Sequence, residues 1–517
     1  MTTWDAIVVG SGPNGLSAAA SIAKAGYSVL VIEAAEEIGG GVRTLPLTLP
    51  GFLHDVCSAI HPLAIGSPAF TAMPLAQYGL DWVHPEIPLA HPLDGGRAVT
   101  LERSLNSTAT NLGQDADTYH RLFAAVVANW NTLTELSTGK VRFPKDATGL
   151  VRAGFTSMRS AMSVLNGFHD PGARALLAGL AAHSNLPLEN AFTAGFAVSL
   201  GASGHAVGWP FPRGGAGNIS HALAGYLRSL GVRFECGVRV NSLDDLPRHR
   251  IVLCDISPRE LLRISGSRLP EWYRRKLENF GYGPGAFKVD WALDAPIPWA
   301  APECARAGTV HLGGSAEEIA ASERAVWAGK TAEEPFVLAA QHTLFDPSRA
   351  PQGKHTAWAY CHVPNGCATD MTDRIERQIE RFAPGFRDRI LARSVLGPMA
   401  LQARNSNLVG GDFCGGSNAW QQLFLRPTFL AFLTPDPRIL ICSASTPPGA
   451  GVHGMCGYYA ARVALPRLRK WTPRPAPSVA TESPVPRTSR LRSAGYFAAG
   501  VAIGVAIAIL VRRKNHS

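Results

Sequence analysis

The chain has 517 residues, 46% of them hydrophobic and 17% charged, and a formal net charge of +10. This length is too great for one hydrophobic core, so at least two domains are expected. The basic residues are scattered, and many lie near the C-terminus beside an apolar segment. This distribution argues against a nucleic-acid partner and favours a membrane-proximal tail.

The start of the chain predicts a dinucleotide site. An apolar run at residues 6–9 predicts a strand, and the turn sequence GSGPNG at residues 10–15 follows it directly. A small-residue helix is expected from about 15 to 25, and a second buried strand at 29–32 leads into Glu33. This order of strand, glycine turn, helix, strand and acid is typical of dinucleotide-binding proteins.

Each residue type in this turn has a physical role. Gly10 allows a tight turn, Gly12 lets the backbone approach a pyrophosphate, and Gly15 lets the helix pack closely on the strand. The helix N-terminus would direct N–H groups at the phosphates, and Glu33 would accept a hydrogen bond from a ribose hydroxyl. The alternative is a glycine-rich turn in an ordinary α/β domain, which leaves the acid at the strand end unexplained.

The next residues indicate which dinucleotide is bound. The run GGGVRT at 39–44 would let backbone and a guanidinium approach phosphate. It resembles the second flavin-contact motif of the glutathione-reductase-type FAD oxidoreductases, and residues 29–63 as a whole resemble the phytoene desaturase (carotenoid oxidoreductase) family. The resemblance recurs near residues 211–240 and 438–465. It implies FAD as the cofactor.

Two later positions match cofactor contacts of that family. Val240 matches a valine that contacts adenine, although a valine in a core strand is an equally good interpretation. Gly451 and Val452 match positions at the pyrimidine edge of the flavin, where a helix N-terminus would stabilise the reduced ring. Ser443 replaces the family's usual glycine, which leaves the ribityl or phosphate contact open. The predicted cofactor-binding residues are Gly10, Ser11, Gly12, Pro13, Asn14, Gly15, Glu33, Gly40, Gly41, Arg43, Thr44, Val240, Gly451 and Val452.

The remaining pattern predicts a second domain interleaved with the first. Helical spacing of apolar residues fills 105–204, and short strands with proline-rich turns fill 285–405. A turn signal at residues 94–96 predicts a hairpin. We therefore expect an α/β fold in which a glutathione-reductase-type FAD-binding Rossmann domain (1–104, 205–284 and 406–470) is interleaved with an α+β substrate domain (105–204 and 285–405).

The end of the chain predicts a proline-rich linker at 471–493 and a transmembrane anchor at 494–511. The anchor segment has no charged residue, and at 1.5 Å per residue it spans roughly 27 Å, about the thickness of the hydrocarbon layer. An amphipathic or buried helix is the alternative, but the segment lacks a polar stripe. A GxxxG pattern at 500–504 is a face on which two copies would pair as a homodimer.

Positive charge flanks both sides of this segment, so it does not decide the orientation in the membrane. We expect the catalytic bulk in the cytoplasm, because the chain carries nine cysteines without any CxxC pair. That odd count predicts reduced thiols and argues against a disulphide framework, a redox-active disulphide or a zinc ribbon. No secretory signal precedes the first strand, and no metal-ligand spacing stands out.

The catalytic residues are not defined by any motif, because the isoalloxazine ring of a flavin carries hydride chemistry by itself. The weak candidates are His54, His61 and His453, which lie in loops that the family places near the flavin, with Asp55 beside the first of them. A histidine can deliver a proton near pH 7. The alternative for each is a histidine that only hydrogen-bonds to nearby backbone.

The resemblance implies a phytoene dehydrogenase-like enzyme that transfers hydride between FAD and a lipophilic substrate, such as an isoprenoid, a polyene or another lipid. A membrane anchor would give such an enzyme access to apolar substrate. Two alternatives remain open. The first is a membrane-tethered, non-catalytic flavoprotein that acts as a scaffold or regulator, and the second is a redox-neutral flavin-dependent isomerase or saturase.

Overall fold

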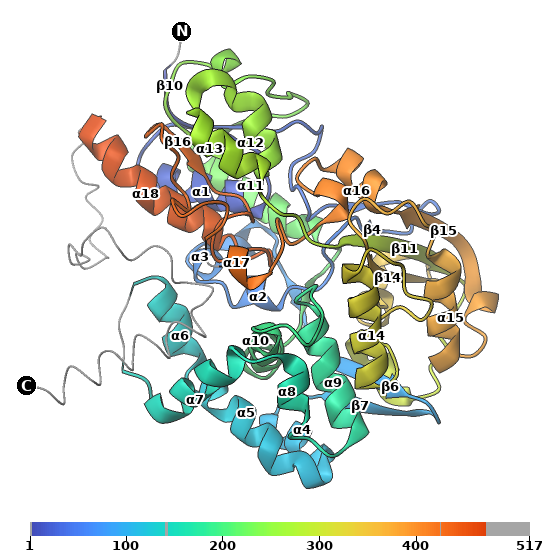
Figure 1. Cartoon of the computed structure of the whole chain (residues 1–517). Helices are drawn as coiled ribbons and strands as arrows, with labels where there is room; N and C mark the ends of the chain where they lie inside the picture. Colours follow the sequence, from blue (N-terminus) through green and yellow to red (C-terminus); the bar gives the residue numbers. More distant parts are fainter. Residues whose placement is uncertain (1–2, 140–142, 424, 472–517) are drawn as a thin grey trace, which may run out of the picture.

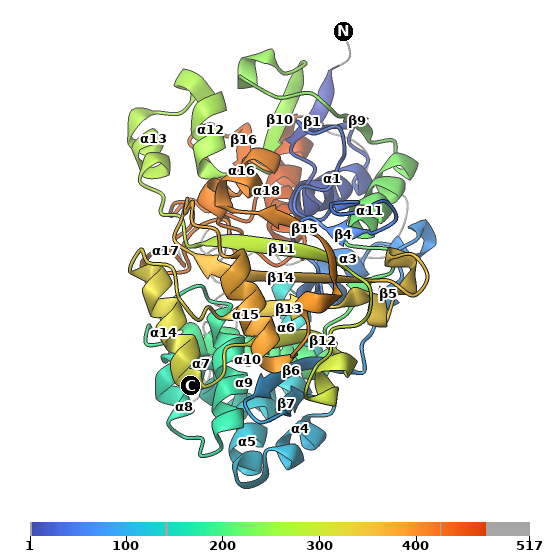
Figure 2. The same ribbon diagram turned by 90° about the vertical axis from the view of Figure 1, so that its right-hand side faces the viewer.

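The computed structural model describes residues 3–139, 143–423 and 425–471 (Figure 1). It contains a five-stranded sheet and a seven-stranded sheet. Figure 2 shows the first sheet at the top, the second across the middle, and a layer of helices at the bottom.

The five-stranded sheet is parallel throughout, with the order β16-β10-β1-β2-β9. Along β1, Ala6 and Val8 enter one hydrophobic core while Ile7 and Val9 enter another. The apolar run at 6–9 is therefore buried on both faces, as parallel strands between two helical layers require. The strands are β1 (Trp4–Val9), β2 (Val29–Ile32), β9 (Arg233–Glu235), β10 (His249–Cys254) and β16 (Ile439–Ile441).

Helices cover both faces of this sheet. One face packs against α1 (Pro13–Lys24), α11 (Gly217–Ser229) and α18 (Met455–Trp471), and the other against α12 (Pro258–Ser265) and α13 (Glu271–Glu278).

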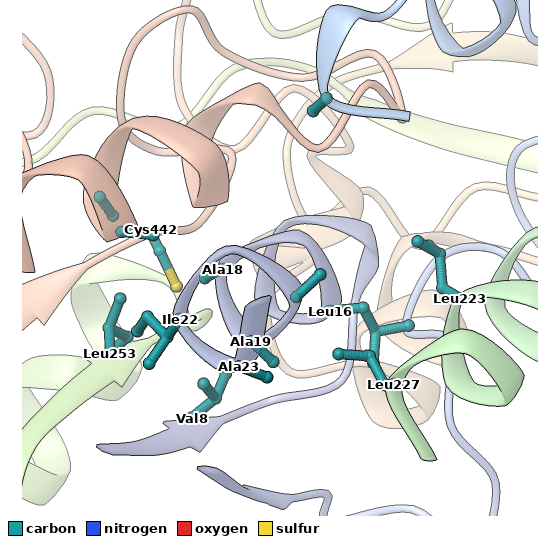
Figure 3. Packing of buried hydrophobic residues seen from close by; sticks show 14 of the residues in the cluster. Val8, Leu16, Ala18, Ala19, Ile22, Ala23, Leu223, Leu227, Leu253 and Cys442 are labelled. Carbon is teal, nitrogen blue, oxygen red and sulfur yellow. The ribbon is translucent and has the colours of Figure 1, made fainter. Parts of the chain in front are cut away.

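Small side chains on α1 allow this close packing. Figure 3 shows Val8 of β1 beneath Ala19 and Ala23 of α1, with Leu16 facing Leu227 of α11. Burying these apolar surfaces stabilises the layer by roughly 25 cal/mol per Å² removed from water.

The seven-stranded sheet has the order β15-β11-β14-β13-β12-β6-β7. Neighbouring strands are antiparallel except for β12 and β6, which are parallel. The predicted hairpin is present as β6 and β7, but it pairs with this second sheet, whereas the sequence analysis placed it in the Rossmann domain. The strands are β6 (Ile87–Leu93), β7 (Arg97–Leu101), β11 (Gly285–Leu293), β12 (Ala307–Leu312), β13 (Val337–Ala340), β14 (His355–Val363) and β15 (Ile390–Leu396).

The helical layer fills most of the stretch between β7 and residue 206. Four of its helices begin at polar caps, where the side chains of Ser104, Asp146, Ser160 and Asp170 each accept a backbone N–H of the first turn. The helices are α4 (Leu105–Asn111), α5 (Ala116–Ala128), α6 (Trp130–Ser137), α7 (Ala147–Ser157), α8 (Ala161–Leu165), α9 (Pro171–Ala182) and α10 (Thr193–Ala206).

Short elements and two sheet-covering helices complete the described chain. The segment after β9 is irregular from 236 to 242. Apart from short 3-10 helices, the remaining elements are β3 (Thr44–Leu45), β4 (His54–Asp55), α2 (Pro62–Ile65), α3 (Pro68–Thr71), β5 (Trp82–Val83), β8 (Phe211–Pro212), α14 (Ala316–Trp327), α15 (Thr372–Phe382), α16 (Pro398–Arg404) and α17 (Trp420–Leu423).

The predicted membrane anchor at 494–511 lies outside the described residues, as does the predicted linker beyond residue 471. Within the described part of the chain, no helix combines the length and the apolar character that a membrane crossing needs.

Candidate functional site

A cavity of about 690 Å³ brings the two glycine loops of the sequence together. Its wall includes residues 10–14 of the turn after β1 and residues 448–452 of the loop before α18. It also includes residues of α10 in the helical layer and of β11, β12, β13 and β14 in the second sheet. The cavity therefore runs between the two sheets and reaches the helices beneath them (Figure 2).

The first glycine turn has the close packing that its sequence predicts. Gly10 has φ +99°, a conformation that strongly favours glycine, and Gly12 is the N-cap of α1. A Cβ atom on Gly15 would lie 2.2 Å from the carbonyl oxygen of Gly10. Residues 10–14 line the cavity, whereas Gly15 is buried behind them.

Glu33 lines the cavity at the end of β2, where the sequence analysis placed a ribose contact. Its carboxylate accepts the backbone N–H of Ser11 at 2.9 Å, the hydroxyl of Ser11 at 2.6 Å and the N–H of Ala35 at 2.9 Å. A carboxylate can accept about four hydrogen bonds, so one further donor, such as a ribose hydroxyl, can be accommodated.

The second glycine cluster lies against the first. Gly40 has φ +56°, and a Cβ atom there would lie 3.1 Å from the Cα of Gly12. Gly40, Gly41 and Arg43 line the cavity. Thr44 does not line the cavity. Its hydroxyl donates to Asp55 at 2.7 Å and accepts the N–H of Gly217 at 3.0 Å.

The three later predicted residues also reach the cavity. Val240, Gly451 and Val452 all line it, although Val240 and Val452 are more than two hundred positions apart. Val452 has φ +55°, a strained conformation for a β-branched residue. Such strain persists only where the surrounding structure imposes it, and it gathers at ligand-binding loops.

The three candidate histidines are absent from the cavity wall. His54 bonds Thr48 at 2.8 Å, His61 bonds Ser58 at 3.0 Å, and His453 accepts the N–H of Met455 at 3.0 Å. Burial is the main cause that lowers the pKa of His54 to about 3 and those of His61 and His453 to about 4. These positions favour the alternative interpretation, histidines that order their own loops.

Asp55 has a structural role near the cavity. It accepts hydrogen bonds from the backbone N–H of Ala216 and from Arg349, whose Nη1 lies 2.6 Å away with both side chains fully buried. Burial alone would raise the pKa of Asp55, but the Arg349 guanidinium holds it well below its ordinary value. The pair joins the β4 loop to the segment before β14.

Sequence reasoning missed Asp255, which lies directly behind the glycine turn. A Cβ atom on Gly12 would lie 2.6 Å from its Oδ2, and the carboxyl accepts the N–H of Gly15. Burial is the main cause that raises the pKa of Asp255 to about 7; the Gly15 N–H opposes this rise and the charge of Glu33 contributes to it. The signal was present, since Asp255 follows the apolar strand β10 as Glu33 follows β2.

Sequence reasoning also missed Lys288 in the middle of β11. Its side chain lines the cavity and pairs with Asp290, and both are buried. Burial raises the pKa of Asp290 to about 6, against the lowering effect of the Lys288 charge. The available signal was two opposite charges at alternate positions of an otherwise apolar strand, which places them on one face.

The rest of the cavity wall is mainly apolar and aromatic. It includes Phe192, Phe196 and Leu200 of the α10 region, with Trp209 after it and Trp358 from β14. Among the described residues that line the cavity from the helical layer and the second sheet, none is acidic. Such a wall suits an uncharged, lipophilic molecule.

All nine cysteines are free thiols. Within the described residues, no group of three or more histidine, cysteine, aspartate or glutamate side chains is arranged to hold a metal ion.

Comparisons with known proteins agree with this geometry. Residues 8–73 match the family model described as an NAD(P)-binding Rossmann-like domain. The mouse pyridine nucleotide-disulfide oxidoreductase domain-containing protein 2 is 24% identical, over 90% of this chain and 94% of its own length. A limonene dehydrogenase polypeptide of Castellaniella defragrans is 28% identical over 23% of this chain and 22% of its own.

Solved structures share the fold. An oxidoreductase from Methanosarcina mazei superimposes with a TM-score of 0.60 at 14% identity, over 89% of this chain and 100% of its own. Cyclohexylamine oxidase from Brevibacterium oxydans gives a TM-score of 0.53 at 15% identity, over 92% and 100%. The chain therefore has the α/β Rossmann-type fold found in these oxidoreductases.

Proposed function

We propose that this protein is an FAD-dependent oxidoreductase that transfers hydride between the flavin and an uncharged, lipophilic substrate. The observation that carries the proposal is the single cavity bordered by both glycine loops and by an aromatic wall. Bound FAD would supply the hydride chemistry. The chain's own residues bind and orient the two molecules.

The residues of the cavity fit a dinucleotide. The turn at 10–14 presents the N-terminus of α1, where negatively charged phosphate is favoured. Asn14 lines the cavity, and its Oδ1 is buried without a hydrogen-bond partner. Glu33 retains acceptor capacity for a ribose, and Arg43 can approach phosphate as a cation.

We call the part of the wall that comes from the helical layer and the second sheet the substrate side, and Lys288 is the ionic side chain that lines it. Its ammonium is held by Asp290, whose other oxygen lies 3.6 Å from the Nδ1 of His54. A lysine in this position can stabilise negative charge or hold a proton at Nζ beside the reacting molecules. It also disfavours a cationic substrate.

Amine oxidation is a second candidate, because a structurally similar protein is named as an amine oxidase. A protonated amine needs a carboxylate or a set of aromatic faces around it. The substrate side of this cavity supplies aromatic faces, but the Lys288 ammonium also lines it and would repel a cation, so we favour a substrate without charge. The phytoene dehydrogenase-like specificity, with an isoprenoid or polyene substrate, is the form of this proposal that the sequence resemblance supports.

Purified protein tests the proposal. A yellow sample whose flavin absorbance bleaches with dithionite and returns with an added acceptor supports an oxidoreductase. A colourless sample that rejects added FAD contradicts it and favours a scaffold. A flavin that must be reduced for turnover, with no net loss of electrons, points instead to an isomerase or saturase.

Lipid extraction tests the substrate class separately. Apolar compounds that co-purify with the full-length protein are identified by mass spectrometry. We expect uncharged isoprenoid or polyene compounds, and co-purified amines would favour the second candidate.

A further inference from the structure

Two histidines meet at the wall of the cavity, on its substrate side. His183 directly follows α9, and His311 lies in β12. Their Nε2 atoms are 3.1 Å apart. His311 is fully buried, whereas His183 is partly exposed and lines the cavity. His183 is thus the member of the pair that a ligand can contact.

The pair is uncharged at physiological pH. Burial lowers the pKa of His183 to about 3 and that of His311 well below its ordinary value. Two neutral imidazoles in this contact share one proton between their facing nitrogens, so that one ring donates and the other accepts. Trp209 packs edge-on against His183, with ring centroids 5.9 Å apart, and restricts its orientation.

The partners of His311 indicate which ring donates. Its Nδ1 is buried without a hydrogen-bond partner, and a Cβ atom on Gly179 would lie only 2.7 Å from it. A buried N–H without a partner costs more than an unused lone pair. We therefore place the proton of His311 on Nε2, which donates to His183. His183 then carries its own proton on Nδ1, and the contact between the two rings does not use this N–H donor.

A second polar group lies next to this pair. Thr309 precedes His311 by two positions in β12, so both side chains lie on the same face of the strand. Thr309 is 3% exposed, lines the cavity, and its hydroxyl has no hydrogen-bond partner. Around these groups the wall is apolar, with Phe196, Leu200 and Leu338.

We propose that His183 and Thr309 form a subsite that binds one uncharged oxygen atom, in particular a carbonyl, on an otherwise apolar substrate. The imidazole donates through Nδ1, and the threonine hydroxyl either donates or accepts. His183 and Thr309 carry no charge that would offset the desolvation of a carboxylate or an ammonium, so a charged group is disfavoured in this subsite. This assignment of a substrate class rests on the proposed function.

Four ligands of one terpene skeleton test the subsite. Limonene has no oxygen, carvone has a ketone, perillate has a carboxylate and perillylamine has an ammonium group. Calorimetry measures their affinities for the full-length protein with and without bound FAD. We expect carvone to bind about tenfold more tightly than limonene, as one hydrogen bond in an apolar site provides, and more tightly than both charged ligands.

Variants of His183 and Thr309 then test whether these two residues cause the preference for carvone over limonene. His183→Leu should weaken carvone about tenfold and leave limonene within about twofold, and His183→Gln, which keeps an N–H donor, should restore part of the loss. Thr309→Val is nearly isosteric and should weaken carvone by about threefold. His120→Leu, on the exposed side of α5, is the matched control.

The subsite is overturned if His183→Leu and Thr309→Val leave the ratio of carvone to limonene affinity unchanged. Tighter binding of perillate or perillylamine than of carvone also overturns it. Failure of the proposed function gives a different result. A colourless protein that still prefers carvone would contradict the proposed FAD-dependent function and support the subsite. A protein that reduces its flavin but does not prefer carvone to limonene would support the proposed function and contradict the subsite.

Discussion

The Oδ2 of Asp255 accepts a hydrogen bond of 2.8 Å from the backbone N–H of Gly15, which lies 240 positions earlier in the chain. The bond joins the end of β10 to the first turn of α1. It explains the glycines of the turn directly, because Cβ atoms on Gly10 and Gly12 would each lie within 3 Å of Asp255 atoms. The turn is therefore shaped by this carboxyl as well as by any phosphate.

Replacing Gly12 tests the turn. We expect Gly12→Val to abolish retention of FAD, because its Cβ would lie 2.6 Å from the Oδ2 of Asp255 and would also obstruct the pyrophosphate. The ratio of flavin absorbance to protein absorbance after purification measures this. Gly167→Ala is the control, since that Cβ meets its nearest neighbour at 3.4 Å. Full flavin content in a folded Gly12→Val protein would contradict the assigned site.

The pH dependence of the stability of Asp255→Asn tests the raised pKa of the buried Asp255 carboxyl. Because burial raises the pKa of Asp255 from 3.8 to about 7, the folded protein holds a proton that the unfolded chain releases. The resulting stability is complete below about pH 4 and is lost as pH rises towards 7, by up to about 1.4 kcal/mol per pH unit.

Urea unfolding of the flavin-free protein between pH 4 and 8 measures this dependence. Asp290 has a raised pKa as well and titrates in both proteins. The difference between wild type and Asp255→Asn therefore isolates Asp255, and we expect the variant to have the shallower decline. Equal slopes would show that Asp255 titrates at an ordinary pKa.

Arg349→Met tests the buried ion pair. The change leaves Asp55 charged in a fully buried position, so we expect unfolding to become easier by about 3–5 kcal/mol. Arg213→Met is the control, because its pair with Asp81 has side chains 53% and 63% exposed, and water screens such a pair so that its loss should have little effect. Urea unfolding compares the two. Similar small losses in both variants would refute a structural role for the Asp55 pair.

Gly457→Ala tests the contact between α18 and the first turn of α1. A Cβ atom there would lie 1.8 Å from the carbonyl oxygen of Asn14, so α18 would have to move away from α1. Overpacking of this kind costs about 1–3 kcal/mol or more, and we expect FAD retention to fall with the melting temperature. Thermal unfolding and flavin content are measured together, and Gly167→Ala again serves as the control. Unchanged values in both would mean that the helices are less closely packed than described.

The sequence alone was sufficient where the signal is local. The strand at residues 6–9, the glycine turn, α1 and β2 follow one another directly, so spacing and residue type predict them together. Most of the residues predicted to bind the cofactor line one cavity, including Val240 and Gly451 from distant segments. For those two positions the family resemblance supplied the information that periodicity lacks.

Only the tertiary structure decided which side chains face that cavity. His54, His61 and His453 have suitable chemistry, but their side chains are buried away from the cavity wall. Each makes a hydrogen bond within its own loop. Asp255 follows an apolar strand and Lys288 belongs to a charged pair within one, but only the fold shows that both reach the wall. The placement of β6 and β7 in the second sheet depended on pairing with β12, more than two hundred residues later. The physical reason is common to these cases: burial and pairing are set by contacts between segments remote in sequence, which no local pattern records.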